Sequence, residues 1–497
     1  MLSYRKLAMR VLGRPLHTEG IDSPRPASQR AAAFILTAAM LTTLAAPAFA
    51  DIWHIENGDI TISAGESGNN VTQNNNTTYG DTNTIITNQN KDTASSHTVT
   101  IEAKDKDDKV EVTLKDVNID TSSRNKAAVS VTGEGDTNIK LDGDNALKSD
   151  IYRSGIYGSG SLTISGGEND SLTAQGGSGA NGISSSGSLT ISGGTVTANG
   201  DDGGRGISSS GSVTISGGST VTANGGSGTI SGGDGIWSGG GVTISGGSTV
   251  TANGGNGGSL VGGDGIRSGG GLTVSDGTVT AKGGNGDSKD GYGGDGIRSG
   301  GVVTISGNTV NAAGGYGGKV GGYGICSFDR VAISGGTVEA AGGNGSTGGG
   351  SGIYSSVIDL SGSLELTAKA GSPNGKALSQ KGSELVLDTI KDKLGPGAKV
   401  TATDADGKVI DQVSTPRPVE PEESSSSSDG GSAAPSAPAS PLPGLTVTDK
   451  DGQRISYTST QSGNTLTVCV GRLTASFRIS LAALRQLRAE GIETIAF

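Results

Sequence analysis

Three aspartates recur in one short motif, Gly-Gly-Asp-Gly-Ile, and their carboxylates are suited to binding a metal ion. They are Asp234, Asp264 and Asp295, separated by 30 and 31 residues. If the motif marks equivalent positions in stacked turns of the chain, the carboxylates repel one another unless a cation lies between them, and calcium prefers such oxygen ligands. Alternatively, each aspartate bonds its own backbone in an Asx-turn before glycine, and Arg267 and Arg298 neutralise the stack. The sequence leaves both interpretations open.

The residue after each recurring Gly-Ile pair should point outward, because alternation along a strand places the isoleucine inside. Tyr157, Trp237, Arg267 and Arg298 occupy this position. Aromatic faces pack against sugar rings, and arginine can fork onto the carboxylates of uronic acids. We therefore predict that these four residues bind carbohydrate. The alternative is a plain solvated face on which Trp237 is half-buried under a loop.

The chain offers little for catalysis. After residue 50 the only histidines are His54 and His97, in unrelated segments. There is no His/Cys metal-ligand spacing and no nucleophile elbow, and the Gly-x-Gly runs lack the following helix of a nucleotide fingerprint. Cys326 and Cys469 lie in different segments, so no disulfide framework is visible. The sequence predicts a binding protein and not an enzyme.

An internal repeat must position these side chains. From about residue 154 the chain cycles through Gly-Ile-x-Ser, x-Thr-Ile-Ser-Gly-Gly and Thr-Val-Thr-Ala-Asn-Gly-Gly, with 24 to 31 residues between successive Gly-Ile pairs. Each unit reads as three short strands with period-2 alternation, broken by glycine. A chain with 90 glycines and 3% aromatic residues cannot fill a deep core, but a thin solenoid needs only small inward residues. The sequence predicts an all-β fold, a right-handed parallel β-helix solenoid.

Stacking the units at about 4.8 Å would align equivalent residues into columns. The inward columns are Ile164, Ile191, Ile215, Ile244, Val274, Ile305 and Ile333; Leu172, Val196, Val221, Val250, Val279, Val310 and Val338; and Ala174, Ala198, Ala223, Ala252, Ala281, Ala312 and Ala340.

Amides and insertions mark the corners of the predicted solenoid. Gln175, Asn199, Asn224 and Asn253 form a predicted ladder of hydrogen-bonded side chains at one corner. The longer insertions, Gly225–Gly235, Gly254–Gly265 and Gly283–Gly296, should collect on one face, which is often the binding face of a solenoid.

Composition divides the chain into five parts. A basic segment, an apolar run and Ala48-Phe49-Ala50 predict a cleaved signal peptide, and the polar stretch Asn69–Asn90 is a predicted loop. The predicted parts are a signal peptide, 1–50; degenerate β-helix coils, 51–153; regular Gly-rich repeats, 154–413; a Pro/Ser-rich linker, 414–444; and a small α+β module, 445–497, with a helix at 481–490 and an abrupt end that suggests incompleteness.

The net charge of the chain and its predicted export limit the classes of partner that it could bind. Removing residues 1–50 takes away six basic and two acidic residues, leaving 31 and 46 and a net charge of −15. This balance disfavours nucleic acid. It fits a secreted or cell-wall-associated protein, which we expect to be a monomer with no membrane-spanning segment after signal removal.

Four stretches occur in an order that resembles a known family. They are Val112–Ile119, Ala127–Val131, Asn138–Asn145 and Gly155–Ile164. This progression is similar to the secreted clostridial-type carbohydrate-binding β-helix domains, related in fold to β-helical polysaccharide lyases, and covers about residues 95–370. The resemblance implies binding of plant cell-wall or acidic polysaccharides, possible calcium binding and no catalysis, although the repeats over residues 178–350 are more uniform than in that family. The alternatives are a surface adhesin or spacer and, less favoured, a β-helical lyase.

Overall fold

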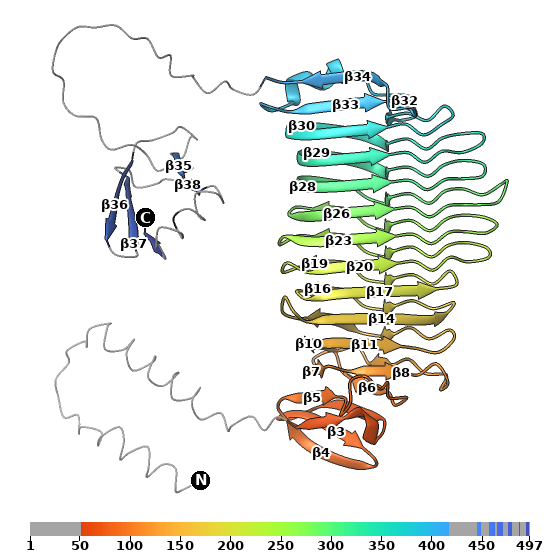
Figure 1. The fold of residues 1–497 in the computed structure, drawn as a ribbon, viewed down its shortest axis with the longest axis vertical. Coiled ribbons are helices and arrows are strands. Elements are labelled where there is room, and N and C mark those ends of the chain that lie inside the picture. The colour runs from red at the N-terminus through yellow and green to blue at the C-terminus, as the bar shows by residue number, and fades with distance from the viewer. Residues whose placement is uncertain are drawn as a thin grey trace, which may run out of the picture. The chain divides into compact units, whose positions relative to one another are not determined.

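The computed structural model describes residues 51–416 and, beyond them, the backbone of five strands between residues 445 and 496 and the helical residue Leu487. The chain divides into two compact units, Met1–Glu420 and Pro421–Phe497. The described part of the first unit is a parallel β-helix of about 11 turns, whose coils stack like rungs (Figure 1). The predicted signal peptide and nearly all of the predicted linker lie outside the described residues.

Each coil contributes a strand to three faces, and each strand pairs in parallel with its equivalents in the neighbouring coils. The first face begins at the Gly-Ile pairs and comprises β2 (Ile60–Gly65), β6 (Val99–Glu102), β9 (Val129–Thr132), β12 (Ile156–Gly158), β15 (Ile183–Ser185), β18 (Ile207–Ser209), β21 (Ile236–Ser238), β24 (Ile266–Ser268), β27 (Ile297–Ser299), the starts of β29 (Ile325–Ala341) and β30 (Ile353–Lys369), and β31 (Leu378–Gln380).

The second face comprises β1 (Ile52–His54), β5 (Thr84–Thr87), β7 (Lys109–Lys115), β10 (Asp136–Asp142), β13 (Ser161–Ser165), β16 (Leu189–Ser192), β19 (Val213–Ser216), β22 (Val242–Ile244), β25 (Leu272–Val274), the start of β28 (Val303–Ala313) and the middle of β29 and β30. The third comprises β8 (Asn118–Asp120), β11 (Asp144–Lys148), β14 (Ser171–Ser178), β17 (Thr195–Asp201), β20 (Thr220–Asn224), β23 (Ser248–Asn253), β26 (Gly277–Lys282), the ends of β28, β29 and β30, and β33 (Lys399–Thr403).

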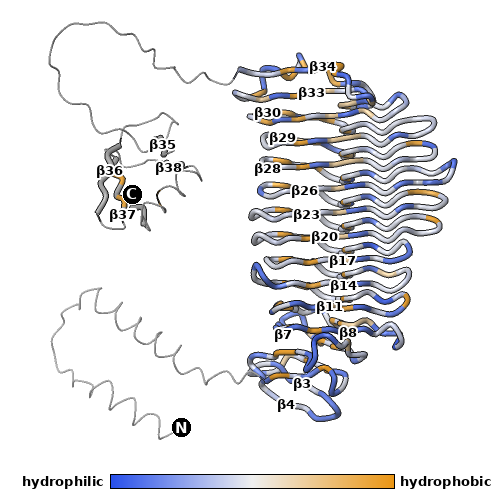
Figure 2. Tube along the Cα trace, in the orientation of Figure 1, coloured by the Kyte–Doolittle hydropathy of each residue, from blue (hydrophilic) through white to orange (hydrophobic). Residues whose placement is uncertain are grey.

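The core is one continuous stack of aliphatic side chains along the axis. Every residue of the three predicted inward columns is at most 2% exposed, and the columns pair as predicted, as with Ile164 opposite Ile191 and Leu172 opposite Val196. Figure 2 shows these apolar positions recurring along the coils between polar ones. The all-β solenoid predicted from the repeat is therefore confirmed.

Polar side chains close the N-terminal end of the core. The predicted loop Asn69–Asn90 is wrong, since β3 (Gly68–Gln73) and β4 (Asn76–Asp81) form an antiparallel cap on β2, and β5 follows. Asn69, Val71 and Gln73 of β3 are buried. The side-chain amides of Asn69 and Gln73 donate hydrogen bonds to backbone carbonyl oxygens at the open end of the solenoid. Gln73 Nε2 donates to the carbonyl oxygens of His54 at 2.9 Å and of Gly58 at 3.0 Å. Polar composition suggested a loop because these buried amides replace apolar residues at the end of a solenoid.

The C-terminal end has a different cap. The 3-10 helix η2 (Leu387–Lys393) buries Leu387 and Ile390 against the last coil. The strand β34 (Val409–Ser414) folds back antiparallel onto β33, and the short β32 (Ser383–Glu384) folds back onto β31. Both ends of the β-helix are thus covered.

The second unit contains two small sheets. The strand β35 (Leu445–Thr448) pairs with β38 (Ser476–Ile479), and β37 (Thr465–Val470) lies between β36 (Tyr457–Ser462) and β39 (Thr494–Ala496). The strands predicted at 446–448 and 466–468 are therefore confirmed. Apart from Leu487, the predicted helix lies outside the described residues.

Glycine-rich loops project beside the first face and form a structure that we call the glycine fin. It consists of the loops 225–235, 254–265, 283–296, 314–324 and 342–352, which belong to the row of turns on one side of the β-helix in Figure 1. The two legs of each loop bond each other and the neighbouring loops. Gly233 N donates to Gly226 O at 2.9 Å, and Gly255 N donates to Gly233 O at 2.8 Å. A Cβ on Gly255 would lie 2.1 Å from Gly226 O, so this close approach of backbones requires glycine.

Candidate functional site

A groove runs between the glycine fin and the first face, and we call it the axial groove. It has a volume of about 880 Å³. Its floor carries Arg267 and Arg298, and its fin wall carries Val261, Tyr292 and Val320 between glycines. These residues come from three successive coils, so the groove follows the solenoid axis.

The structure brings most of the predicted site residues together. Arg267 and Arg298 line the axial groove, as do all three aspartates, at the corner where the fin meets the first face. Trp237 occupies the same outward column as Arg267 and pairs with it across neighbouring strands. Its indole ring is half-buried and lies under the Arg205 guanidinium, 4.5 Å from the ring centre. Trp237 therefore flanks the groove through its contact with Arg205.

Tyr157 lies apart from the other predicted residues. It shares the outward column, but Ser184 and Ser208 separate it from Trp237. It lines a second hollow of about 550 Å³ over the earlier coils, together with Lys126, Tyr152 and Arg153. The four predicted carbohydrate contacts thus form two sites on one face.

The aspartates form a ladder of hydrogen bonds between coils. Asp234 Oδ1 accepts the backbone N–H of Asp264 at 2.9 Å, and Asp264 Oδ1 accepts that of Asp295 at 2.7 Å. Asp295 Oδ1 accepts the N–H of Tyr323 at 2.7 Å. Asn181 does the same for Arg205 on earlier coils, at 2.8 Å. Each side chain therefore fixes the backbone of the next coil, and not its own turn.

The other carboxylate oxygens face arginines. Arg205 Nε donates to Asp234 Oδ2 at 3.2 Å. Arg298 Nε lies 2.9 Å from Asp295 Oδ2 and 3.4 Å from Asp264 Oδ2. Burial and the neighbouring charges of Asp295 and Asp234 raise the pKa of Asp264 to about 8, and burial also raises the pKa of Asp295. Burial alone would lower the pKa of Arg298, but Asp295 and Asp264 raise it.

The arrangement fits a ladder better than a calcium site. All six carboxylate oxygens have a backbone N–H or an arginine within 3.4 Å. Within the described residues, no group of three or more His, Cys, Asp or Glu side chains is placed to hold a metal ion. These aspartates therefore do not offer free oxygens to calcium, and calcium binding stays a prediction.

Arg205 and Tyr323 are groove residues that the sequence analysis did not identify. Both precede a Gly-Ile pair, as the three aspartates do, so the signal was their shared position and not their residue type. The Tyr323 ring stacks on Tyr354, with centroids 4.9 Å apart and planes at 14°. The column before Gly-Ile thus supplies an arginine, Arg205, at one end of the groove and a tyrosine, Tyr323, at the other.

The predicted amide ladder holds for three of its four members. Asn224 Nδ2 donates to Asn199 Oδ1, and Asn253 Nδ2 donates to Asn224 Oδ1, both at 2.8 Å. Gln175 Nε2 instead bonds the carbonyl oxygen of Gly176 at 3.0 Å. This ladder lies on the third face and stabilises the solenoid beside the fin.

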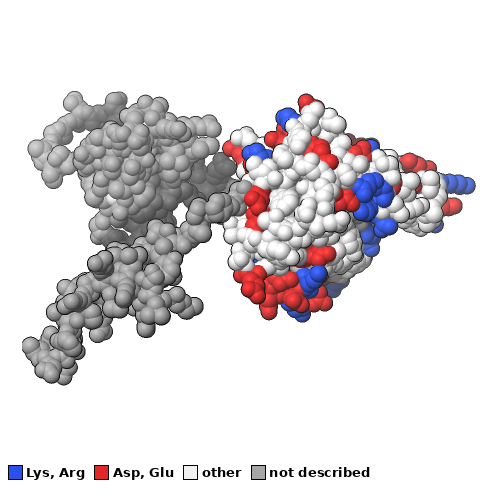
Figure 3. Space-filling model, turned by 90° about the horizontal axis from the view of Figure 1, so that it is seen from below, with Lys and Arg blue, Asp and Glu red and all other residues white. Residues whose placement is uncertain are grey.

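Charge is unevenly distributed on the first unit. Figure 3 views the β-helix from its N-terminal end, where acidic side chains occupy much of the rim and basic ones gather on the side of the fin.

Comparisons with known proteins leave the family open. No protein-family model, no curated protein and no solved structure matches this chain. The parallel β-helix is the part of the predicted family resemblance that the structure supports. Among the described residues, no helix has the length and apolar character needed to cross a membrane.

Proposed function

We propose that this protein binds polysaccharide without cleaving it, and that the chain of sugars lies along the axial groove. The observation that carries the proposal is the match between a repeating site and a repeating ligand. Arg205, Arg267 and Arg298 recur at intervals of one or two coils along the groove, and the coils are about 4.8 Å apart. A linear glycan presents its hydroxyl groups in the same repeating way.

The groove offers both kinds of contact that sugars use. Its fin wall presents Val261, Tyr292 and Val320 to the apolar faces of sugar rings, and its floor presents guanidinium groups to hydroxyl or carboxylate oxygens. Three arginines and three aspartates line the groove, so their formal charges cancel, and the raised pKa of Asp264 leaves only a small positive excess near neutral pH. This balance supports recognition by stacking and hydrogen bonding.

The bonding of the aspartates supports a role without catalysis. A glycosidase needs a pair of carboxyl groups free to reach the glycosidic oxygen and C1, and a lyase needs a free base. In the groove each carboxylate oxygen has a backbone or arginine partner that belongs to the solenoid itself. We accordingly propose a secreted or cell-surface binding module, monomeric and directed at plant cell-wall or acidic glycans.

Retention on insoluble glycans tests the proposal. The purified full-length protein is applied to pectin, xylan and cellulose, with calcium and with a chelator. We expect retention of the wild type on at least one glycan, weakened about tenfold or more in Trp237→Ala and Arg267→Gln. Tyr79→Ala is the matched control, because Tyr79 is 77% exposed on the N-terminal cap, away from the groove.

The calcium arm separates two roles of the aspartates. Loss of retention with chelator would favour a calcium site, and unchanged retention would favour the hydrogen-bonded ladder. A wild type retained on none of the glycans would contradict polysaccharide binding and favour a surface adhesin or spacer.

A further inference from the structure

The hollow around Tyr157 is built from two adjacent positions in consecutive coils. At the first of these positions, the backbone adopts the left-handed conformation in each coil, at Asn125 (φ 53°), Tyr152 (φ 58°) and Gly179 (φ 77°). Each residue lies four positions before a paired residue of the first face, Val129, Ile156 and Ile183. The three are therefore equivalent turns, stacked in register beside the hollow.

Tyr152 is the exception in this column. Glycine and asparagine tolerate the left-handed conformation, whereas a bulky side chain adopts it rarely and with strain. The Tyr152 side chain is nonetheless 78% exposed, so packing in the core does not hold it there. Its ring leans on the next coil, where a Cβ on Gly179 would lie 2.9 Å from two of its carbons. A strained, exposed aromatic residue at the rim of a hollow is the kind of outlier that ligand sites retain.

Two cations occupy the next position of the same turns. Lys126 and Arg153 each lie three residues before the paired Val129 and Ile156, so they stack on adjacent coils and repel each other. Arg153 Nε donates to Asn125 Oδ1 at 3.2 Å, its one side-chain hydrogen bond to the residues that the structure describes. Its terminal amino groups are therefore open to a ligand.

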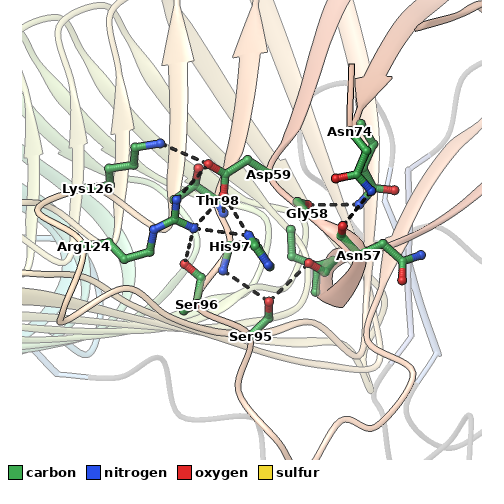
Figure 4. Close-up of polar contacts among 12 residues, drawn as sticks. Asn57, Gly58, Asp59, Asn74, Ser95, Ser96, His97, Thr98, Arg124 and Lys126 are labelled. Atoms are coloured by element: carbon green, nitrogen blue, oxygen red, sulfur yellow. Dashed lines mark hydrogen bonds and ion pairs between the residues drawn. The ribbon is translucent and has the colours of Figure 1, made fainter. Parts of the chain in front are cut away.

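Asp59 holds the cationic side of the hollow in place (Figure 4). Its carboxylate accepts hydrogen bonds from both terminal nitrogens of Arg124, at 2.9 and 3.1 Å, and from Lys126 Nζ at 3.1 Å. Burial would raise the pKa of Asp59, but the Thr98 N–H and both cations hold it well below its usual range. Asp59 is thus ionised and is shared by two cations, which leaves Lys126 donors free for another anion.

The charges near the hollow sum to an excess of one positive charge. Arg124, Lys126 and Arg153 are opposed by Asp59 and by Asp150, which accepts the backbone N–H of Asn125. The whole chain carries −11. A local positive excess, two tyrosines at the rim and the hydroxyl groups of Thr100, Ser130 and Ser184 in the lining favour an anionic sugar over an inorganic ion.

We propose that this hollow, lined by Lys126, Tyr152, Arg153 and Tyr157, is a subsite for the carboxylate or sulfate group of an acidic sugar residue. The cations would bind the anionic group, and the tyrosines would pack on the ring that carries it. The inference rests on the proposed glycan binding. It adds a selectivity element on the same face, several coils before the formally neutral axial groove.

Two pairs of probes distinguish binding to the anionic group from binding to the sugar chain that carries it. Oligogalacturonate is compared with its methyl ester, and dextran sulfate with dextran, by calorimetry on the full-length protein. We expect Arg153→Gln and Lys126→Gln to weaken binding of the charged member of at least one pair about tenfold, to reduce its salt dependence, and to leave the uncharged member unchanged. The pair that responds distinguishes carboxylate from sulfate. The matched control is Lys140→Gln, an exposed lysine of the second face.

Tyr152→Asn adds a test that does not depend on removing charge. Asparagine is the residue of the preceding turn and accepts this backbone conformation, so the unfolding midpoint should stay the same or rise while affinity for the acidic glycan falls. Wild-type affinity in the Arg153, Lys126 and Tyr152 variants would overturn the subsite. If Arg267→Gln then still weakened both members of a pair, the axial-groove proposal would stand alone. Absence of wild-type binding to all four probes would overturn the subsite, and absence of retention on pectin, xylan and cellulose as well would overturn both proposals.

Discussion

Neutralising Asp264 should stabilise the β-helix at alkaline pH. In Asp264→Asn the amide keeps an oxygen for the backbone N–H of Asp295, and Asn181 makes this same contact naturally on earlier coils. The substitution removes a buried charge that faces two other carboxylates. The perturbation is therefore electrostatic, with the packing and the ladder conserved.

The direction follows from the raised pKa. Asp264 has a folded pKa of about 8 against an ordinary 3.8, so between these values the folded protein holds a proton that the unfolded chain has released. Its contribution to stability is complete below about pH 4 and is lost towards pH 8, by about 1.4 kcal/mol per pH unit. The whole window amounts to at most about 6 kcal/mol. We expect about half of this, because opening of a single coil lets the carboxylate reach water.

Urea denaturation between about pH 4 and about pH 8 measures the effect. Wild-type stability should fall as pH rises, and the slope for Asp264→Asn should be shallower by about half a proton on average over this range. Asp59 and Asp120 have lowered pKa values, so their contributions change at lower pH. Asp276→Asn, at an exposed aspartate, should match the wild type. Equal slopes for Asp264→Asn and wild type, or wild-type stability that rises across this range, would refute the reasoning.

Three further substitutions test parts of the scaffold. Gly255→Ala should destabilise by about 2 kcal/mol or more, because its Cβ would lie 2.1 Å from the Gly226 carbonyl oxygen and one leg of the fin must move; an unchanged thermal midpoint would contradict the packing. Tyr152→Asn should gain up to about 1 kcal/mol in chemical denaturation by removing left-handed strain, whereas a loss would mean that its ring supports the turn. Asn224→Ala leaves the amides on both neighbouring coils without a partner and should cost about 1–3 kcal/mol, with faster hydrogen exchange confined to those coils as the signature.

The repeat predicted the β-helix well because its information is local and repeated. Once one Gly-Ile pair is assigned to a strand, the alternation of side chains assigns every Ile, Val and Ala of the regular coils to the inside. Because equivalent residues stack on one another, only one pairing register between coils is possible. The repeat did not predict the cap at Asn69–Gln73, because the solenoid ends there and the pattern of the regular coils no longer applies. Buried amides satisfy open backbone groups at an end, so its strands carry polar residues where the regular coils carry aliphatic ones.

The sequence placed the candidate site residues on one outward face but did not show how the hollows divide them. The outward column was identified correctly, yet Tyr157 and Trp237 belong to different hollows because the loops beside them differ in length. The hollow at Tyr157 lies before the long fin loops begin. Arg205 was missed because it stands where later coils have aspartate. The contacts between glycine legs have no side-chain pattern, so the sequence could not show that the insertions pack into a wall.

If the protein binds glycans as proposed, the construction of the groove determines where its selectivity would come from. Much of the fin wall is backbone whose N–H and C=O groups bond one another, as from Gly255 to Gly233, so it offers shape more than specific hydrogen bonds. On that proposal, selectivity would come from the outward column of the first face, where serine, tryptophan and arginine replace one another at Ser208, Trp237 and Arg267 without changing strand register. Since the core lies on the other side of each strand, exposed residues of this column such as Arg267 can vary with little effect on folding. Arg298 is different, because it also neutralises the buried carboxylates of Asp264 and Asp295. The scaffold thus separates most of its stability, carried by the inward columns and the ladders, from the proposed recognition, which the outward column would carry.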